Sequence, residues 1–152
     1  MQVQPILAFN GRGDEALEFY CKALGAEVTT MLRWKNSPDP GMCASARGFE
    51  DKIMHATFRI GETTLMATDG MTATSEPVFK GITLALEVPN DTEAKRVFAA
   101  LSDGGQVQMP LAKMFWSSSS GMVTDRFGVM WMVNVAGKTG NRETSVLLQA
   151  VS

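Results

Sequence analysis

The chain has 152 residues and one histidine, His55, whose imidazole is the first group to consider for chemistry. In the stretch IMHATFRI, a strand period of two divides the residues between two faces. The first face carries Ile53, His55, Thr57 and Arg59, and the opposite, apolar face carries Met54, Ala56, Phe58 and Ile60. A histidine on the first face can serve as a general base or hydrogen-bond a ligand. The alternative, which we favour, is a structural histidine bonded to a carbonyl or to a carboxylate such as Asp69.

Two carboxylates are the other candidates for acid–base work. Asp69 closes a strand in MATDG and precedes Gly70, so turn formation is its expected task. Glu87 in ALEVPN shares a strand face with Thr83 and is the best carboxylate for a cavity, or else a solvated charge at a strand end. His55 and Glu87 are therefore the two weak catalytic candidates, and the sequence identifies no catalytic residue.

The stretch FWSSSSGMVTDRFGVMWMVNV combines aromatic residues, a serine run and an apolar strand. Trp116 can stack on a planar ligand, and a core position is the alternative. The serines 117–120 lack the strand–G-x-S-x-G–helix context of a nucleophile, so we interpret them as a turn. Asp125 and Gly128 are placed to make the next turn. We expect Val129, Trp131, Val133 and Val135 to face the helices, and Met130, Met132 and Asn134 to face a cavity.

Bulk composition narrows the class of protein. The hydrophobic fraction of 45% and charged fraction of 20% are those of a globular protein, and the net charge of −2 gives no footprint for nucleic acid. No apolar run is long enough to span a bilayer, and the first residues do not resemble a signal peptide. Two cysteines outside any CxxC pair suggest a reducing compartment. We therefore expect a cytoplasmic protein that binds neither nucleic acid nor membrane.

Two helical segments position these residues, and they look like copies of one unit. Residues 14–28 and 90–107 each carry an apolar helical stripe, and glycines at 25 and 104 are placed to end the helices. Asn90 and Glu93 have the spacing of an N-terminal capping box. Strands are expected at 3–9, 28–34, 53–60 and 63–68 in the first half, and at 82–88, near 106, at 113–117, 122–124 and 129–135 in the second. Each half reads β-α-β-β-β, and residues 36–51 read as a long loop of the kind that forms lids.

This duplicated plan resembles the vicinal oxygen chelate superfamily of glyoxalases, bleomycin-resistance proteins and extradiol dioxygenases, and within it the PhnB-like group. The residues that carry the resemblance are PILAFNGRGDEALEFYCKALGAEV, DKIMHATFRIGETTLMATD and FWSSSSGMVTDRFGVMWMVN. It implies an α+β fold in which two tandem βαβββ modules form a curved mixed sheet around a central cavity. It also implies one domain over residues 1–136, with modules at about 1–70 and 80–136, a C-terminal tail at 137–152, and a homodimer.

The resemblance also locates the positions where metal-dependent relatives carry four ligands, usually His, Glu or Gln. In this chain Pro5, Met66, Thr83 and Met132 stand there. Thioethers favour soft ions, and only the neighbouring Gln4 is an ordinary ligand for a hard cation. We therefore expect no metal and no cofactor. The residues expected to contact a ligand are His55, Arg59, Met66, Thr83, Glu87, Trp116, Met130, Met132 and Asn134.

The expected function is that of a PhnB-like protein that binds a small, partly apolar molecule of unknown identity. Eleven methionines suit such a pocket, because methionine adapts its shape to irregular contacts. One alternative is a metal-dependent lyase, isomerase or dioxygenase with a relocated site that uses His55, Glu87 or Asp69. Another is a drug-sequestering resistance protein. The sequence leaves open whether any reaction is catalysed.

Overall fold

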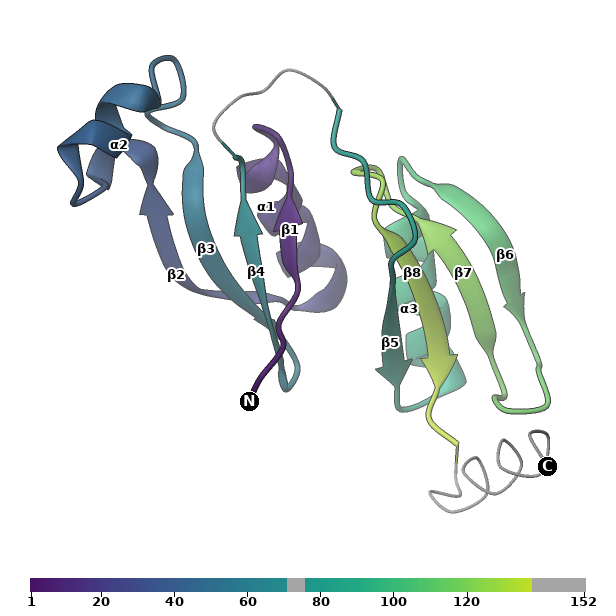
Figure 1. The fold of residues 1–152 in the computed structure, drawn as a ribbon. Helices are drawn as coiled ribbons and strands as arrows, with labels where there is room; N and C mark the ends of the chain where they lie inside the picture. The colour runs from purple at the N-terminus through teal and green to yellow at the C-terminus, as the bar shows by residue number, and fades with distance from the viewer. Residues whose placement is uncertain (71–75, 138–152) are drawn as a thin grey trace, which may run out of the picture. The chain divides into compact units, whose positions relative to one another are not determined.

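The computed structural model describes residues 1–70 and 76–137, and the chain divides into two compact units, Met1–Val78 and Phe79–Ser152. Each unit combines a long helix with a four-stranded mixed sheet, so the α+β class and the two tandem βαβββ-like modules are confirmed (Figure 1). The curvature of the sheets around one cavity and the extent of a single domain stay predictions. The predicted tail lies outside the described residues from position 138 onward.

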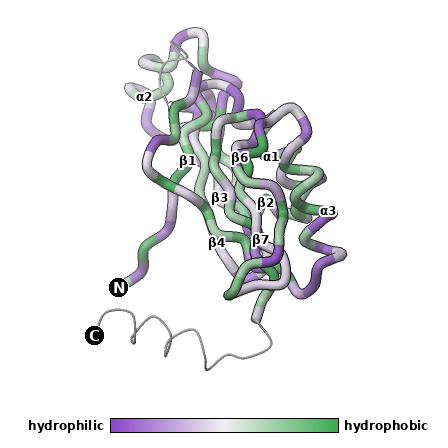
Figure 2. The backbone as a smooth tube through the Cα atoms, turned by 90° about the vertical axis from the view of Figure 1, so that its right-hand side faces the viewer, coloured by the Kyte–Doolittle hydropathy of each residue, from purple (hydrophilic) through white to green (hydrophobic). Residues whose placement is uncertain are grey.

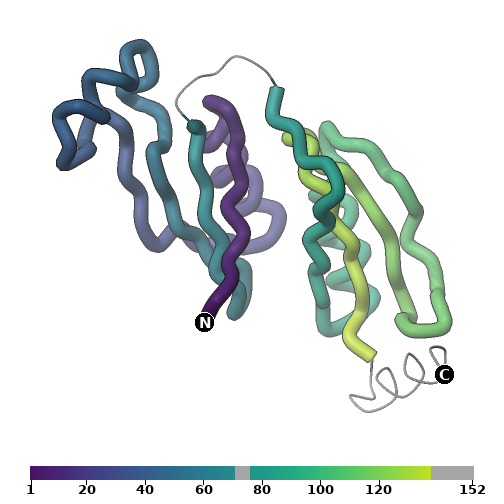
Figure 3. The backbone as a smooth tube through the Cα atoms, viewed as in Figure 1, coloured from purple at the N-terminus to yellow at the C-terminus, as the bar shows by residue number. Residues whose placement is uncertain are grey.

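The first unit has the sheet order β1-β4-β3-β2, with β1 parallel to β4 and the other pairs antiparallel. Figure 3 follows the chain from β1 to the neighbouring β4. Its elements are β1 (Ile6–Ala8), α1 (Gly13–Leu24), β2 (Glu27–Arg33), a 3₁₀ turn (Trp34–Asn36), α2 (Pro40–Ser45), β3 (Ile53–Ile60) and β4 (Thr63–Thr68).

The second unit repeats this topology in the order β5-β8-β7-β6, with β5 parallel to β8. Its elements are β5 (Thr83–Val88), α3 (Asp91–Ser102), β6 (Gln106–Ala112), β7 (Ser120–Thr124) and β8 (Met130–Val135). The helices α1 and α3 have the same length of 12 residues, as expected of copies.

The two long helices form where the apolar stripes predict them. In α1, Ala16, Leu17 and Tyr20 are buried, and the Tyr20 ring stacks on Phe58 of β3 with centroids 6.2 Å apart. The helix ends at Gly25, whose φ of 66° is in the left-handed region that glycine reaches most easily. In Figure 2 the helices carry hydrophobic and hydrophilic residues in turn, as expected of helices with one buried side.

The start of α3 confirms Asn90 as its cap, since the Asn90 side chain accepts a hydrogen bond from the Glu93 N–H at 2.8 Å. The Glu93 carboxylate pairs with Arg96. Four apolar side chains of the predicted stripe are buried against the sheet, namely Ala94, Val97, Phe98 and Leu101.

The predicted loop 36–51 contains a short helix, so the prediction that it lacks regular structure was wrong. Asp39 caps α2 by accepting hydrogen bonds from the N–H groups of Gly41 and Met42, and Pro40 occupies the first turn. A helix of six residues is too short to show an apolar period in the sequence. In the sequence, Asp39 and Pro40 are the residues typical of the start of a helix.

The strand predicted at 113–117 is also wrong. The edge strand β6 continues to Ala112, and the residues before β7 form a loop. The strand predicted near 106 therefore runs further than expected, through Pro110, although proline donates no ladder hydrogen bond. An edge strand tolerates it, and the pairing of β6 with β7 shifts register between Met109 and Ala112.

Ile53 does not share the face of His55, contrary to the strict alternation predicted for this strand. Its side chain is fully buried and lies against Gly13 at the start of α1. The register between β2 and β3 shifts where Leu32 pairs with His55 and Arg33 pairs with Ile53. The register therefore skips Met54, as in a β-bulge, and the Ile53 side chain points toward α1.

Candidate functional site

Each sheet packs one face on its long helix, and no helix of residues 1–70 and 76–137 packs on the opposite face, which we call the helix-free face. Along β8, Trp131 and Val133 are buried toward α3, whereas Met130, Met132 and Asn134 alternate with them and stay half-buried. The predicted division of this strand between its two faces is confirmed.

The helix-free face of the second unit collects most of the predicted ligand contacts. On β5, Thr83 and Glu87 are exposed, with Ala85 between them. The parallel register places Thr83 opposite Met130, Ala85 opposite Met132, and Glu87 opposite Asn134. Five of the predicted contact residues thus lie on one face. Thr83 and Met132, which stand where metal-dependent relatives carry metal ligands, are not direct partners in this register.

The first unit brings a second group together on its helix-free face. Met66 of β4 lies opposite Ile6 of β1 and opposite Thr57 of β3. Pro5 only precedes β1, and the exposed Ile6 takes the outward position next to the buried Leu7. The predicted pair of Pro5 and Met66 is therefore one residue out of register on β1.

His55 and Arg59 lie on β3, on the same side as Thr57. Arg59 forms an ion pair with Glu27 of the neighbouring β2 at 2.7 Å, and both side chains are more than half exposed. An ion pair exposed to water contributes little to stability, so the Arg59 guanidinium can leave Glu27 and bind a ligand instead. His55 is half-buried, and within the described residues it makes no hydrogen bond to Asp69.

Asp69 is a fully buried structural carboxylate. Its Oδ1 accepts hydrogen bonds from the N–H groups of Gly11 at 3.0 Å and Gly13 at 2.7 Å, and its Oδ2 accepts one from Ile53 N–H at 2.8 Å. It joins the β1–α1 loop, the start of α1 and the start of β3. Because all three contacts are structural, Asp69 leaves the list of candidate acids.

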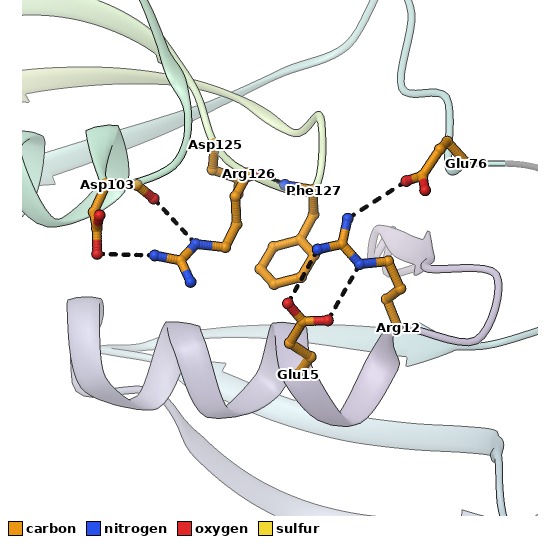
Figure 4. Close-up of polar contacts among 7 residues, drawn as sticks. All are labelled: Arg12, Glu15, Glu76, Asp103, Asp125, Arg126 and Phe127. Carbon is orange, nitrogen blue, oxygen red and sulfur yellow. Dashed lines mark hydrogen bonds and ion pairs between the residues drawn. The ribbon is translucent and has the colours of Figure 1, made fainter.

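The turn before β8 is held by Asp125, as predicted. Its buried carboxylate accepts hydrogen bonds from the backbone N–H groups of Phe127 and Val129 and from the indole of Trp131. Arg126 donates to the Asp103 carbonyl and carboxylate, which ties the turn to the end of α3 (Figure 4). In the first unit, Arg12 makes comparable ion pairs with Glu15 and Glu76 (Figure 4).

The serine run holds the β6–β7 loop in place. Ser118 and Ser119 both donate to Oδ1 of Asp91 at the start of α3, and Ser120 donates to Asn134 on β8. The buried Ser117 hydroxyl accepts a hydrogen bond from Val135 N–H at 3.1 Å. Each hydroxyl has a structural partner. Ser117, Ser118 and Ser119 lie in the β6–β7 loop, whereas Ser120 begins β7, so the reading of the whole run as a turn holds only for its first three residues.

A pocket of about 510 Å³ opens where this loop meets α3 and the end of β8. The lining residues are Pro89, Asn90, Asp91, Lys113, Met114, Phe115, Trp116, Ser117, Ser118, Val135, Ala136 and Gly137. Of the predicted ligand contacts only Trp116 lines it. In the sequence, the aromatic pair beside the serine run was the one feature that pointed to this pocket. The other walls come from segments far apart in the chain.

Trp116 connects this pocket to the helix-free face. Its Nε1 lies 3.4 Å from Oδ1 of Asn134, the atom that also accepts from Ser120. Phe115 meets the Trp116 ring edge-on, with centroids 4.6 Å apart and planes at 86°. Phe115 is 88% exposed and Trp116 is 38% exposed, so the pair presents an aromatic surface to solvent.

We expect that replacing Ser118 and Ser119 together with alanine raises the pKa of Asp91. Hydrogen bonds from Ser118 and then Ser119 hold the pKa of the Asp91 carboxyl below its ordinary value of 3.8, with a smaller contribution from Lys95. Their loss moves the pKa back toward that value, so the carboxylate is protonated at a higher pH than in the natural protein. Carboxyl ¹³C NMR titration measures this. Ser45→Ala, in the other unit, is the control, and an unchanged pKa of Asp91 in the double variant would contradict the assignment.

The residues on the helix-free faces do not fit a divalent metal ion. Met66, Thr83, Met130 and Met132 offer thioethers and one hydroxyl, which are poor ligands for a hard cation. Glu87 and Asn134 are the neighbouring oxygen donors on β5 and β8. Across positions 1–70 and 76–137, no three His, Cys, Asp or Glu side chains are grouped closely enough to hold a metal.

The helices of the described residues include none that is both long and apolar enough to cross a membrane.

Residues 2–133 match the family described as the glyoxalase/bleomycin resistance protein/dioxygenase superfamily. Over 141 residues the chain is 34% identical to Protein YjdN of Escherichia coli strain K12, an alignment that covers 89% of this chain and 95% of that protein.

Two solved structures share both fold and sequence with the chain. Protein PA1353 from Pseudomonas aeruginosa is 44% identical, with a TM-score of 0.77 over 90% of this chain and 98% of that one. A PhnB protein from Bacillus cereus, described as a putative 3-demethylubiquinone-9 3-methyltransferase, is 25% identical, with a TM-score of 0.72 over 90% of this chain and 100% of that one.

Proposed function

Since the chain belongs to the glyoxalase/bleomycin resistance protein/dioxygenase superfamily and has PhnB-like structural neighbours, we propose that it binds a small, partly apolar molecule on the helix-free faces of its sheets without a divalent metal ion. The ligand contacts in this proposal are His55, Arg59, Met66, Thr83, Glu87, Trp116, Met130, Met132 and Asn134.

The observation that carries the proposal is the kind of side chain on these faces. Met130, Met132 and Asn134 project from β8 beside Thr83 and Glu87 of β5, and all five are half-buried or exposed. An adaptable apolar surface with a few polar groups is the usual lining of a small-molecule site. At the four positions where metal-dependent relatives carry their ligands, the side chains of Pro5, Met66, Thr83 and Met132 supply no imidazole or carboxylate.

The rival proposal of an enzyme with a relocated site is weakened by Asp69. That carboxylate already accepts hydrogen bonds from three buried backbone N–H groups, so of the three residues named in this rival proposal His55 and Glu87 are left for acid–base work. A drug-sequestering function is less well supported, since cationic drugs need an acidic lining and, among the described residues of β5 and β8, Glu87 is the one carboxylate. A methyl-transfer reaction would need a nucleotide-binding fold for its cofactor, and the βαβββ units do not supply one.

The metal-free part of the proposal is tested by elemental analysis of the purified, dialysed protein. We expect zinc, nickel, manganese and iron each far below one equivalent. A metal close to one per chain that survives dialysis would contradict the proposal.

The proposed homodimer is tested by sedimentation, and the proposed cytoplasmic location is tested by cell fractionation.

The binding part is tested by screening small molecules for a shift in melting temperature, since a bound ligand stabilises the folded state. We expect Met132→Lys to abolish the shift given by a hit, because the ammonium places a charge on the helix-free face. Val107→Lys, at an exposed position on edge strand β6, is the matched control and should keep the shift. Equal shifts in both variants would place the ligand elsewhere.

A further inference from the structure

The pocket beside the serine run has features that specify a ligand class, and the inference drawn from them goes beyond the proposed function, with which it shares only Trp116. Its walls include apolar residues from three segments, with Pro89 before α3, Phe115 and Trp116 in the β6–β7 loop, and Val135 at the end of β8. Its volume of about 510 Å³ is in the range of small-molecule sites.

The aromatic corner of the pocket suits a planar ring. Phe115 and Trp116 stand almost perpendicular, so a third ring can lie flat on one and meet the other edge-on. The Trp116 indole is oriented by Asn134, whose oxygen is also bonded to Ser120. This support gives the corner a defined geometry before any ligand binds, which lowers the entropy lost on binding.

Two opposite charges line the same pocket. Asp91 uses Oδ1 for the hydroxyls of Ser118 and Ser119, which leaves Oδ2 for another donor. Within the described part of the chain, Lys113 has no hydrogen bond or ion pair. The pocket therefore offers one carboxylate and one ammonium next to an aromatic corner.

From this charge complementarity we propose that the pocket binds a small aromatic zwitterion, of which an aromatic α-amino acid is the simplest example. The ligand ammonium pairs with Asp91, its carboxylate pairs with Lys113, and its ring packs on Phe115 and Trp116. A ligand with only one charge leaves the opposite protein charge unpaired, so it binds more weakly than the zwitterion.

Trp116 makes the test specific. The chain has three tryptophans, and Trp34 and Trp131 are 4% and 2% exposed, whereas Trp116 is 38% exposed. Acrylamide quenching of fluorescence therefore reports mainly on Trp116, and L-phenylalanine as the probe adds no indole signal. We expect L-phenylalanine to protect Trp116 from quenching, and Trp116→Phe to abolish the protectable component.

The charge assignment is tested with two single-charge probes, 2-phenylethylamine and 3-phenylpropionate. For L-phenylalanine, we expect Asp91→Asn and Lys113→Met each to weaken binding about threefold, the size typical of a solvent-exposed ion pair. For the amine only Asp91→Asn should weaken binding, and for the carboxylate only Lys113→Met. Asp91→Asn keeps an acceptor for the two serines, so the loop is retained.

Two results would overturn the inference. Equal affinity for all three probes, unaffected by either variant, would show a purely apolar pocket. Trp116 already shielded in the ligand-free protein would show that another part of the protein covers the pocket. Failure of the proposed function is read separately, from the comparison of Met132→Lys with Val107→Lys, because neither residue lines this pocket.

Discussion

Replacing Asp69 with alanine is expected to lower the free energy of unfolding by about 4 kcal/mol, because three buried backbone donors then lose their acceptor and each unsatisfied donor costs about 1–3 kcal/mol. The donors belong to Gly11, Gly13 and Ile53, so the loss acts on a loop, a helix start and a strand start at once. Urea unfolding followed by circular dichroism measures the change.

Asparagine at position 69 should have an intermediate effect. Its amide oxygen can still accept from Gly11 and Gly13, but its amide nitrogen faces the N–H of Ile53, so one bond is replaced by a contact between two donors. We expect a loss of about 2 kcal/mol. Hydrogen exchange should speed up most at Ile53.

The matched control for position 69 is Asp51→Ala. Asp51 is 82% exposed and pairs with Lys35 in water, so its loss should leave the urea unfolding midpoint close to that of the natural protein. Equal losses for Asp51→Ala and Asp69→Ala, or an Asp69→Asn protein as stable as the natural one, would contradict the structural role of Asp69.

Periodicity predicted the parts of the fold in which one local pattern repeats. The stripes of α1 and α3 and the alternation along β8 follow from which residues must be buried, and the structure confirms them. The partners of Asp69 did not follow, because they come from segments far apart in the sequence. Ile53 was misplaced for a related reason, since an irregular pairing between two strands leaves no periodic trace.

The candidate site divides in the same way. Alternation alone placed Thr83 and Glu87 on one face of their strand, as found. The pairing of Arg59 with Glu27 required the register of two strands, which the sequence does not specify. The pocket required the positions of residues 89–91, 113–118 and 135–137 together. Local patterns thus predict faces, whereas sites made by several segments need the folded chain.

The second large effect is expected at Asp125, the buried carboxylate of the second unit. Asp125→Ala should lower the free energy of unfolding by about 4 kcal/mol, since two backbone N–H groups and the Trp131 indole lose their acceptor. The indole contact can be isolated, because Oδ2 accepts from Trp131 at 2.9 Å while Oδ1 serves the two backbone groups.

A double-mutant cycle between Asp125→Asn and Trp131→Phe measures that contact. In the natural protein, Trp131→Phe leaves Oδ2 buried without its indole donor, which costs about 2 kcal/mol beyond the loss of packing. In the Asp125→Asn protein the same change removes a clash between two N–H donors, so it should cost at least about 1 kcal/mol less. The packing loss is the same in both backgrounds and cancels in the cycle.

The control is Trp34→Phe in the first unit, whose effect on the free energy of unfolding should add to that of Asp125→Asn. If the effects of Trp131→Phe and Asp125→Asn also add to within about 0.5 kcal/mol, the indole hydrogen bond contributes nothing to the stability of the turn.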